Sequence, residues 1–192
     1  VAVSGLVLNG EAEPYGTTAR EYLALAQKFL EGRGMVLDTW KARQGTWAEG
    51  SHYTFHETLR TLILTLHAYR SATDADYFPL IHRDFGDFVT KAGFFLLGCT
   101  RPDMTLERTG DISASRAAAA LTVPLTVEML AAGAGTPADA SRLRSFSRAL
   151  QIAYGPKSVW AEFAWGMRIF FDPRASIEPS YTTLPLFQRL GA

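Results

Sequence analysis

The 192 residues include only one cysteine, Cys99, so an intrachain disulfide and a cysteine-based metal site are both excluded. The formal net charge is zero, because 19 lysines and arginines balance 19 aspartates and glutamates. This balance leaves no overall positive field to attract nucleic acid or an anionic membrane. The apolar run at 1–8 is too short to span a bilayer. We therefore expect neither nucleic acid nor a membrane as a partner.

The composition that remains is that of a folded domain, because 47 % of the residues are apolar and 12 % are aromatic. Cys99 ends an apolar run, which predicts a buried and inert thiol. The chain starts at Val1 within one apolar run and stops at Ala192 within another. We expect both ends to be cuts through a longer polypeptide.

Helical periodicity covers nearly the whole chain, and strand patterns are scarce. A capping-box pattern at 18–21 opens the first helix, whose expected apolar face is Tyr22, Leu25, Ala26, Phe29 and Leu30. A second helix is predicted over 52–71, with an apolar stripe of Leu59, Leu62, Leu66 and Tyr69, and the region 74–99 forms either one helix or a pair, bent at Pro79. A helix over 113–132 is expected to be capped by Asp111 and kinked at Pro124. The last two helices are predicted over 136–153, capped by Thr136, and over 157–171. Short turns between them indicate an all-α chain of antiparallel helix pairs. A bundle, a solenoid and a closed (α/α) toroid all fit, although the lack of a fixed repeat disfavours the common solenoids.

The densest polar and aromatic stretch is 45–60, where a Gly-containing loop leads into a helix. Tyr53, His56 and Arg60 are spaced i, i+3 and i+7, so they share one helix face. Glu49 comes just before that helix, near its positive end. The stretch is either a site in which these groups converge or a capped amphipathic helix with a solvated polar face.

The segment Trp47-Ala48-Glu49-Gly50-Ser51-His52-Tyr53 resembles the Trp-x-Glu-Gly-x-x-Tyr segment of the heparinase II/III-like polysaccharide lyases, a group that includes oligoalginate lyases. The resemblance extends to 1–8, to the long helix before the Gly-containing loop, to 108–111 and to 184–191. It implies an incomplete (α/α) toroid followed by a β-sandwich. Residues 1–183 would then form the helical domain, and 184–192 would start the linker into the sandwich.

The resemblance also implies a chemistry, which is β-elimination on a polysaccharide that contains uronic acid. Tyr53 is the expected catalytic residue, because a phenol near a cation can exchange a proton with C5 or O4 of the sugar. The expected substrate-binding residues are Trp47, Glu49, His52, His56, Arg60, Arg108 and Asp111. The family's neutralising Asn or His would precede Val1, and a further His would belong to the β-sandwich, so the chain by itself should be inactive.

The partners that follow from the resemblance are an acidic polysaccharide or oligosaccharide and the β-sandwich of the same polypeptide. A homodimer is also allowed, and the location would be periplasmic or secreted. No cofactor and no metal are expected. His52 and His56 have a zinc-compatible spacing, but no third ligand is evident.

Other hypotheses stay open at this stage. A glycoside hydrolase on an (α/α) toroid would need two carboxyl groups, for which Glu49 and Asp111 are the candidates. A non-catalytic binding or scaffolding module would need neither. His67 and His82 are interpreted as satisfied core or surface histidines, and the remaining acidic residues as solvated.

Overall fold

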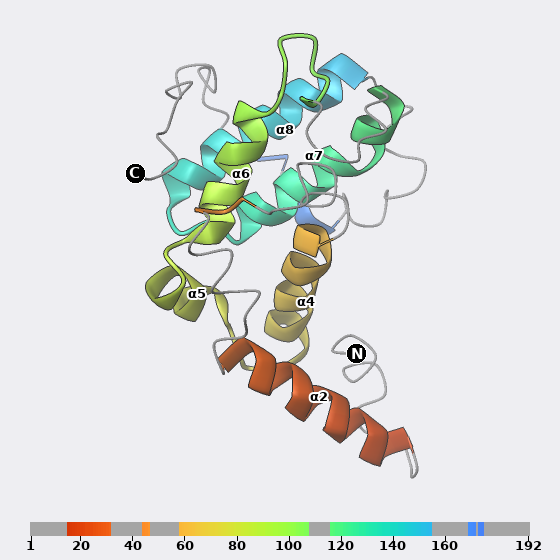
Figure 1. Cartoon of the computed structure of the whole chain (residues 1–192), viewed down its shortest axis with the longest axis vertical. Coiled ribbons are helices and arrows are strands. Elements are labelled where there is room, and N and C mark those ends of the chain that lie inside the picture. Colours follow the sequence, from red (N-terminus) through yellow and green to blue (C-terminus); the bar gives the residue numbers. More distant parts are fainter. Residues whose placement is uncertain are drawn as a thin grey trace.

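The computed structural model describes residues 15–31, 44–46, 58–107, 116–154, 169–171 and 173–174. Six helices lie in these ranges: α2 (Tyr15–Glu31), α4 (Leu59–Ala72), α5 (Phe78–Asp84), α6 (Phe88–Gly98), α7 (Arg116–Ala132) and α8 (Pro137–Tyr154) (Figure 1). The β-pairing described there is one isolated bridge, between Thr100 and Leu106. The prediction of an all-α chain is therefore confirmed for the described residues. None of the helices described is long and apolar enough to cross a membrane.

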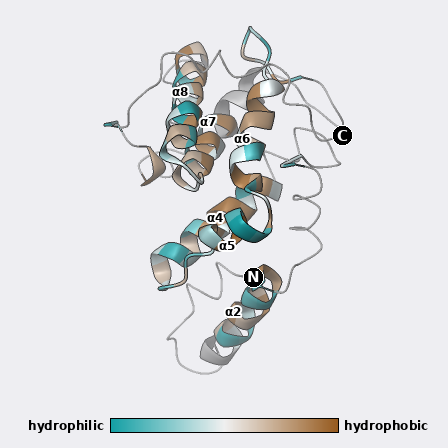
Figure 2. Cartoon of the chain, turned by 90° about the vertical axis from the view of Figure 1, so that its left-hand side faces the viewer, coloured by the Kyte–Doolittle hydropathy of each residue, from teal (hydrophilic) through white to brown (hydrophobic). Residues whose placement is uncertain are grey.

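The longer helices of the core, α4, α6, α7 and α8, run in two opposite directions. α4 and α7 run the same way, because His67 contacts the carbonyl of Met129 and Arg70, one turn later, contacts the carbonyl of Ala132. α6 and α8 run the opposite way, and α7 and α8 form a closely packed hairpin (Figure 1). α6, α7 and α8 gather at one end of the molecule, whereas α2 lies at the other end beyond α4 and α5 (Figures 1 and 2).

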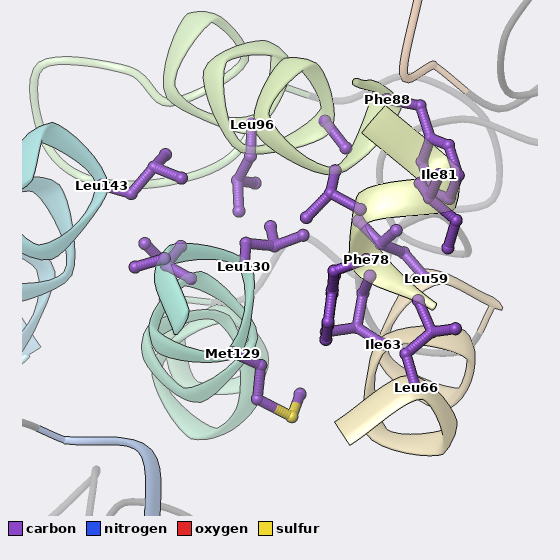
Figure 3. Close-up of a cluster of buried hydrophobic side chains, with 14 of the residues drawn as sticks. Leu59, Ile63, Leu66, Phe78, Ile81, Phe88, Leu96, Met129, Leu130 and Leu143 are labelled. Atoms are coloured by element: carbon purple, nitrogen blue, oxygen red, sulfur yellow. The ribbon is translucent and has the colours of Figure 1, made fainter. Parts of the chain in front are cut away.

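The core forms where α4, α5, α6, α7 and α8 meet (Figure 3). Its fully buried side chains include Leu59, Ile63, Leu66, Phe78, Ile81, Phe88, Leu96, Met129, Leu130, Leu143 and Phe146. Burying each such side chain stabilises the fold by about 1.5–3 kcal/mol. The stripe predicted for α4 is confirmed, with Leu59, Leu66 and Tyr69 buried and Leu62 partly buried.

The region 74–99 forms two helices, so the alternative of one long helix bent at Pro79 is wrong. Pro79 lies in the first turn of α5, where its missing N–H removes no helical hydrogen bond. The break comes later, at Asp87, whose backbone is left-handed with φ of 55°. The Asp87 carboxylate accepts a hydrogen bond from the Thr90 amide and caps α6.

α2 begins at Tyr15, so the capping box predicted at 18–21 lies inside the helix and does not start it. The predicted apolar face is also partly wrong. The helix turns Ala19, Leu23, Ala26 and Leu30 toward the rest of the chain, with Ala19 and Leu30 buried. Tyr22, Leu25 and Phe29 remain exposed. Apolar side chains cover a wider part of the surface of α2 than its contact with the rest of the chain requires. The sequence pattern did not show which of them make that contact.

The hairpin of α7 and α8 follows the sequence closely. Pro124 lies inside α7, and the Ser147 hydroxyl of α8 donates to the Pro124 carbonyl at 3.3 Å. The Thr136 hydroxyl accepts from the Asp139 amide at 3.1 Å and so caps α8 as predicted. Most of the helix expected over 157–171 and the domain boundary expected at 183 lie outside the described residues.

Candidate functional site

Seven of the eight expected site residues lie outside the described residues: Trp47, Glu49, His52, Tyr53, His56, Arg108 and Asp111. The eighth, Arg60, lies in the first turn of α4 and is half-buried. Apart from Arg60, the structure therefore describes the residues on either side of each expected segment of the site.

The segment 47–57, which carries the Trp-x-Glu-Gly-x-x-Tyr motif, is held at both ends. Before it, Gly45 is buried against the backbone of α6 at Lys91 and Ala92. After it, Thr58 has helical backbone angles and leads directly into α4. Tyr53 is five residues before Thr58, which limits its distance from the start of α4 to about 18 Å even in a fully extended chain. The motif thus joins α6 to the N-terminal end of α4.

Glycine at position 45 is required for this contact. Its φ is +88°, and the preceding Gln44 is also left-handed with φ of 53°. A Cβ on residue 45 would lie 2.5 Å from the Ala92 nitrogen and 2.8 Å from the Lys91 carbonyl carbon. Both atoms belong to the backbone of a helix and cannot swing aside, so only glycine permits so close an approach.

The segment that leads to Arg108 and Asp111 begins as a tight loop after α6. The Arg101 amide donates to the Thr105 carbonyl at 2.8 Å, and the Glu107 amide donates to the Cys99 carbonyl at 2.7 Å. Glu107, the last described residue of this segment, is thus bonded back to the residue that follows α6. The C-terminal end of α6 and the start of α7 both lie in the upper part of the view in Figure 1, whereas α4 starts near the middle of the molecule.

His67 is a buried histidine whose two ring nitrogens are both engaged. Nε2 donates to the Met129 carbonyl at 2.8 Å, and Nδ1 accepts from the Arg70 guanidinium at 2.8 Å. Burial is the main reason that the pKa of His67 falls to about 4, and the charge of Arg70 lowers it further. A neutral imidazole with no free nitrogen joins α4 to α7 and has no proton to exchange with a ligand. The interpretation of His67 as a satisfied core histidine is confirmed.

His82 and Asp87 form a half-buried pair at the turn between α5 and α6, with Nδ1 and Oδ1 2.6 Å apart. The hydrogen bond that His82 donates to the Asp87 carboxylate raises the pKa of His82 above its usual value, against the effect of burial. Burial by itself raises the pKa of Asp87, but hydrogen bonds from His82 and Thr90 outweigh it and the net direction is downward. Both shifts favour the charged forms of the pair, which fastens a turn. His82, too, is a satisfied histidine as predicted.

Two tyrosines in the described part have hydroxyls that serve the fold. The Tyr69 hydroxyl donates to the Leu23 carbonyl at 3.2 Å, and the Tyr77 hydroxyl donates to Glu31 at 3.2 Å. Burial first, and then the negative charge of Glu31, raise the pKa of Tyr77 to about 12. A raised pKa lowers the fraction of phenolate near neutral pH, and both hydroxyls are bonded within the fold, so neither tyrosine replaces Tyr53 as a candidate.

Cys99 is buried, as predicted, and burial together with the charge of Glu107 raises its pKa to about 12.

Sequence reasoning missed one charged residue, Glu128, which was interpreted as solvated and is only 1 % exposed. Its Oε2 atom lies 3.9 Å from Nε of Arg144, which brings α7 and α8 into electrostatic contact across their interface. A signal was present, because Glu128 is the only charged residue within the apolar stretch 117–134.

Among the described residues, no three His, Cys, Asp or Glu side chains gather closely enough to hold a metal ion. The comparisons with known proteins add no neighbour: no model of a protein family, no curated protein and no solved structure matches the chain.

Proposed function

We propose that the chain is the helical part of a polysaccharide lyase that cleaves an acidic, uronic-acid-containing polysaccharide or oligosaccharide by β-elimination. In this proposal a β-sandwich of the same polypeptide completes the active site, and the enzyme acts in the periplasm or outside the cell. The helices belong to an incomplete (α/α) toroid. The proposal rests on the Trp-x-Glu-Gly-x-x-Tyr resemblance of residues 47–53.

The observation that carries the proposal is the way in which the two expected parts of the site are anchored. The motif enters α4 at its N-terminal end, and the segment with Arg108 and Asp111 leaves the loop after α6 and enters α7 at its N-terminal end. α4 and α7 contact each other through His67 and Met129 and through Arg70 and Ala132, so the proposal assigns the two segments to the N-terminal ends of two neighbouring helices. In the proposal, residues 53 and 108, more than fifty positions apart, contribute to one site.

The packing of the helices supports the toroid. α4 and α7 are parallel neighbours, α6 and α8 are parallel neighbours, and each pair runs opposite to the other. An (α/α) toroid has this arrangement, in which successive hairpins place their first helices in one layer and their second helices in the other. A simple four-helix bundle with short loops would instead make α4 and α7 antiparallel or diagonal partners.

The proposed reaction removes the proton on C5, breaks the bond between C4 and O4, and leaves the electron pair as a C4=C5 double bond. The Tyr53 phenolate takes the C5 proton, and the phenol so formed gives that proton to O4 as the C4–O4 bond breaks. Arg60, seven residues later in the sequence and half-buried at the start of α4, brings positive charge to the same helix face. That charge favours the phenolate and the carboxylate of the substrate.

The test is an absorbance assay for the 4,5-unsaturated product, made with the complete gene product on heparin, heparan sulfate, hyaluronan, chondroitin, alginate and ulvan. Tyr53→Phe should lower turnover of the active substrate by at least about 100-fold, because it removes the proton-transfer group. Tyr77→Phe is the matched control, since it deletes the same hydroxyl from a tyrosine bonded to Glu31. It should keep full turnover and lose about 1 kcal/mol of stability.

Absence of an unsaturated product from every polymer, with the protein folded, would refute the lyase. Hydrolysis without unsaturation that is lost in Glu49→Gln and Asp111→Asn but not in Tyr53→Phe would identify the hydrolase instead. Binding of sugars without turnover would identify a non-catalytic module.

A further inference from the structure

α2 carries an apolar surface that the rest of the described chain does not cover. Five large apolar side chains are exposed in the described residues, and three of them lie on this helix: Tyr22 is 36 % exposed, Leu25 59 % and Phe29 39 %. Their spacing of three and four residues places them in one stripe along the helix. We call Tyr22, Leu25 and Phe29 the outer stripe.

The outer stripe is separate from the contact that attaches α2 to the body of the molecule. We call the face that packs on the rest of the chain the attaching face, and it consists of Ala19, Leu23, Ala26 and Leu30. The last three each follow a member of the outer stripe by one position, and Ala19 precedes Leu23 by four. Successive helix positions are about 100° apart, so the two stripes point in different directions. α2 also lies at one end of the molecule, where a second protein can approach it (Figures 1 and 2).

Two opposite charges flank the outer stripe. Glu21 and Lys28 are both exposed and lie beside it on the side away from the attaching face. They are seven residues apart, about 10 Å along the helix, so they cannot pair with each other within one helix. The carboxylate nearest in sequence to Lys28 is Glu31, which already accepts hydrogen bonds from Gln27 and Tyr77.

We propose that the outer stripe binds the outer stripe of a second copy of this chain, with the two α2 helices antiparallel. Tyr22 then packs on the partner's Leu25, and Leu25 packs on the partner's Tyr22. In an antiparallel helix pair the flanking positions of one class face each other, so Glu21 meets the partner's Lys28 on both sides of the two-fold axis. A parallel pair would bring Glu21 to the partner's Ala26 and form no ion pair.

The positions of Glu21 and Lys28 thus favour a second copy of the chain as the partner, with its α2 helix antiparallel. The surface complements itself, which is the requirement for a two-fold symmetric interface. One helix of 17 residues buries less than about 1,200 Å² in such a pair, so the dimer should be weak and dependent on concentration.

Sedimentation analysis of the full chain up to about 0.1 mM tests the pairing. The wild type should dimerise, and Leu25→Glu should be monomeric, because it places a charge at the centre of the stripe. Glu21→Lys and Lys28→Glu should each weaken the dimer about tenfold, because each replaces two attractions by two repulsions. The double variant should recover the wild-type affinity. Gln27→Lys, on the opposite side of α2, is the control and should dimerise as the wild type does.

Mixing the two single variants is the sharpest arm of the experiment. Glu21→Lys presents two lysines and Lys28→Glu presents two glutamates, so the mixture should form a heterodimer that is tighter than either homodimer. Circular dichroism checks that each variant is folded. A wild type that stays monomeric, single variants that dimerise normally, or a double variant that fails to recover would each overturn the proposal.

Discussion

Replacement of Gly45 by alanine tests the contact on which the position of the motif segment depends. Alanine in a left-handed conformation costs about 1–2 kcal/mol relative to its ordinary backbone region. The new Cβ would also lie 2.5 Å from the Ala92 nitrogen, far inside van der Waals contact. Forcing a methyl group into such a site costs about 1–3 kcal/mol, so we expect Gly45→Ala to lower the free energy of unfolding by about 3 kcal/mol in total.

Urea unfolding followed by circular dichroism measures this change, with an unchanged m-value as the sign that only stability has shifted. Gly98→Ala is the matched control, because a Cβ at the last residue of α6 meets no atom within 4 Å. That variant should be neutral or gain about 0.5 kcal/mol, since alanine loses less backbone entropy than glycine on folding.

The same variant reports on the proposed site. If the Gly45 contact with α6 positions the segment that follows, Gly45→Ala should also lower lyase turnover at temperatures where the protein remains folded, and Gly98→Ala should not. A loss of less than about 1 kcal/mol in Gly45→Ala would refute the argument, because it would mean that the loop moves away from α6 at little cost.

Three further predictions concern single groups. His67 has a lowered pKa, so the folded chain binds fewer protons than the unfolded chain between pH 6.5 and about 4. The free energy of unfolding should therefore fall by up to about 3 kcal/mol as the pH drops through that range. Chemical denaturation at several pH values should show a shallower fall in His67→Gln. His82 has a raised pKa, so its contribution is complete below pH 6.5 and is lost as the pH rises through the raised value; an NMR titration should move that value downward in Asp87→Asn and contradicts the pairing if it does not. Thr136→Ala should cost about 1 kcal/mol in urea unfolding because the α8 cap is lost, and Thr136→Ser should restore it.

The helical hairpins were the part of the fold that the sequence made easiest to predict. The stripe of α4 and the cap of α8 follow from local rules, because helical spacing brings the apolar residues onto one side and Thr136 precedes a helical proline. The break between α5 and α6 was harder, because it lies at Gly86 and Asp87, both left-handed, whereas Pro79 drew attention to the wrong position. Gly86 was a signal for this break, since glycine readily adopts a positive φ.

The candidate site was predicted as a motif, and the structure supplies its anchors. Sequence spacing predicts Tyr53 and Arg60 on one helix face, but it carries no information on how α4 and α7 pack, which the contacts of His67 with Met129 and of Arg70 with Ala132 show. The buried position of Glu128 was missed for a similar reason. Its surroundings are made by α8, which is distant in the sequence and brings Arg144 to it.

The amino-acid sequence determined the helical class, the caps, the buried thiol and the absence of a nucleic-acid signature, since each depends on composition or on residues a few positions apart. Only the tertiary structure decided which of two apolar stripes on α2 faces the chain, which histidines are satisfied, and that Gly45 must be glycine. Those properties depend on contacts between residues far apart in the sequence, such as Gly45 with Ala92 and His67 with Met129. Long-range contacts are set by how whole helices pack, and local periodicity carries no information about the partner that a helix face meets.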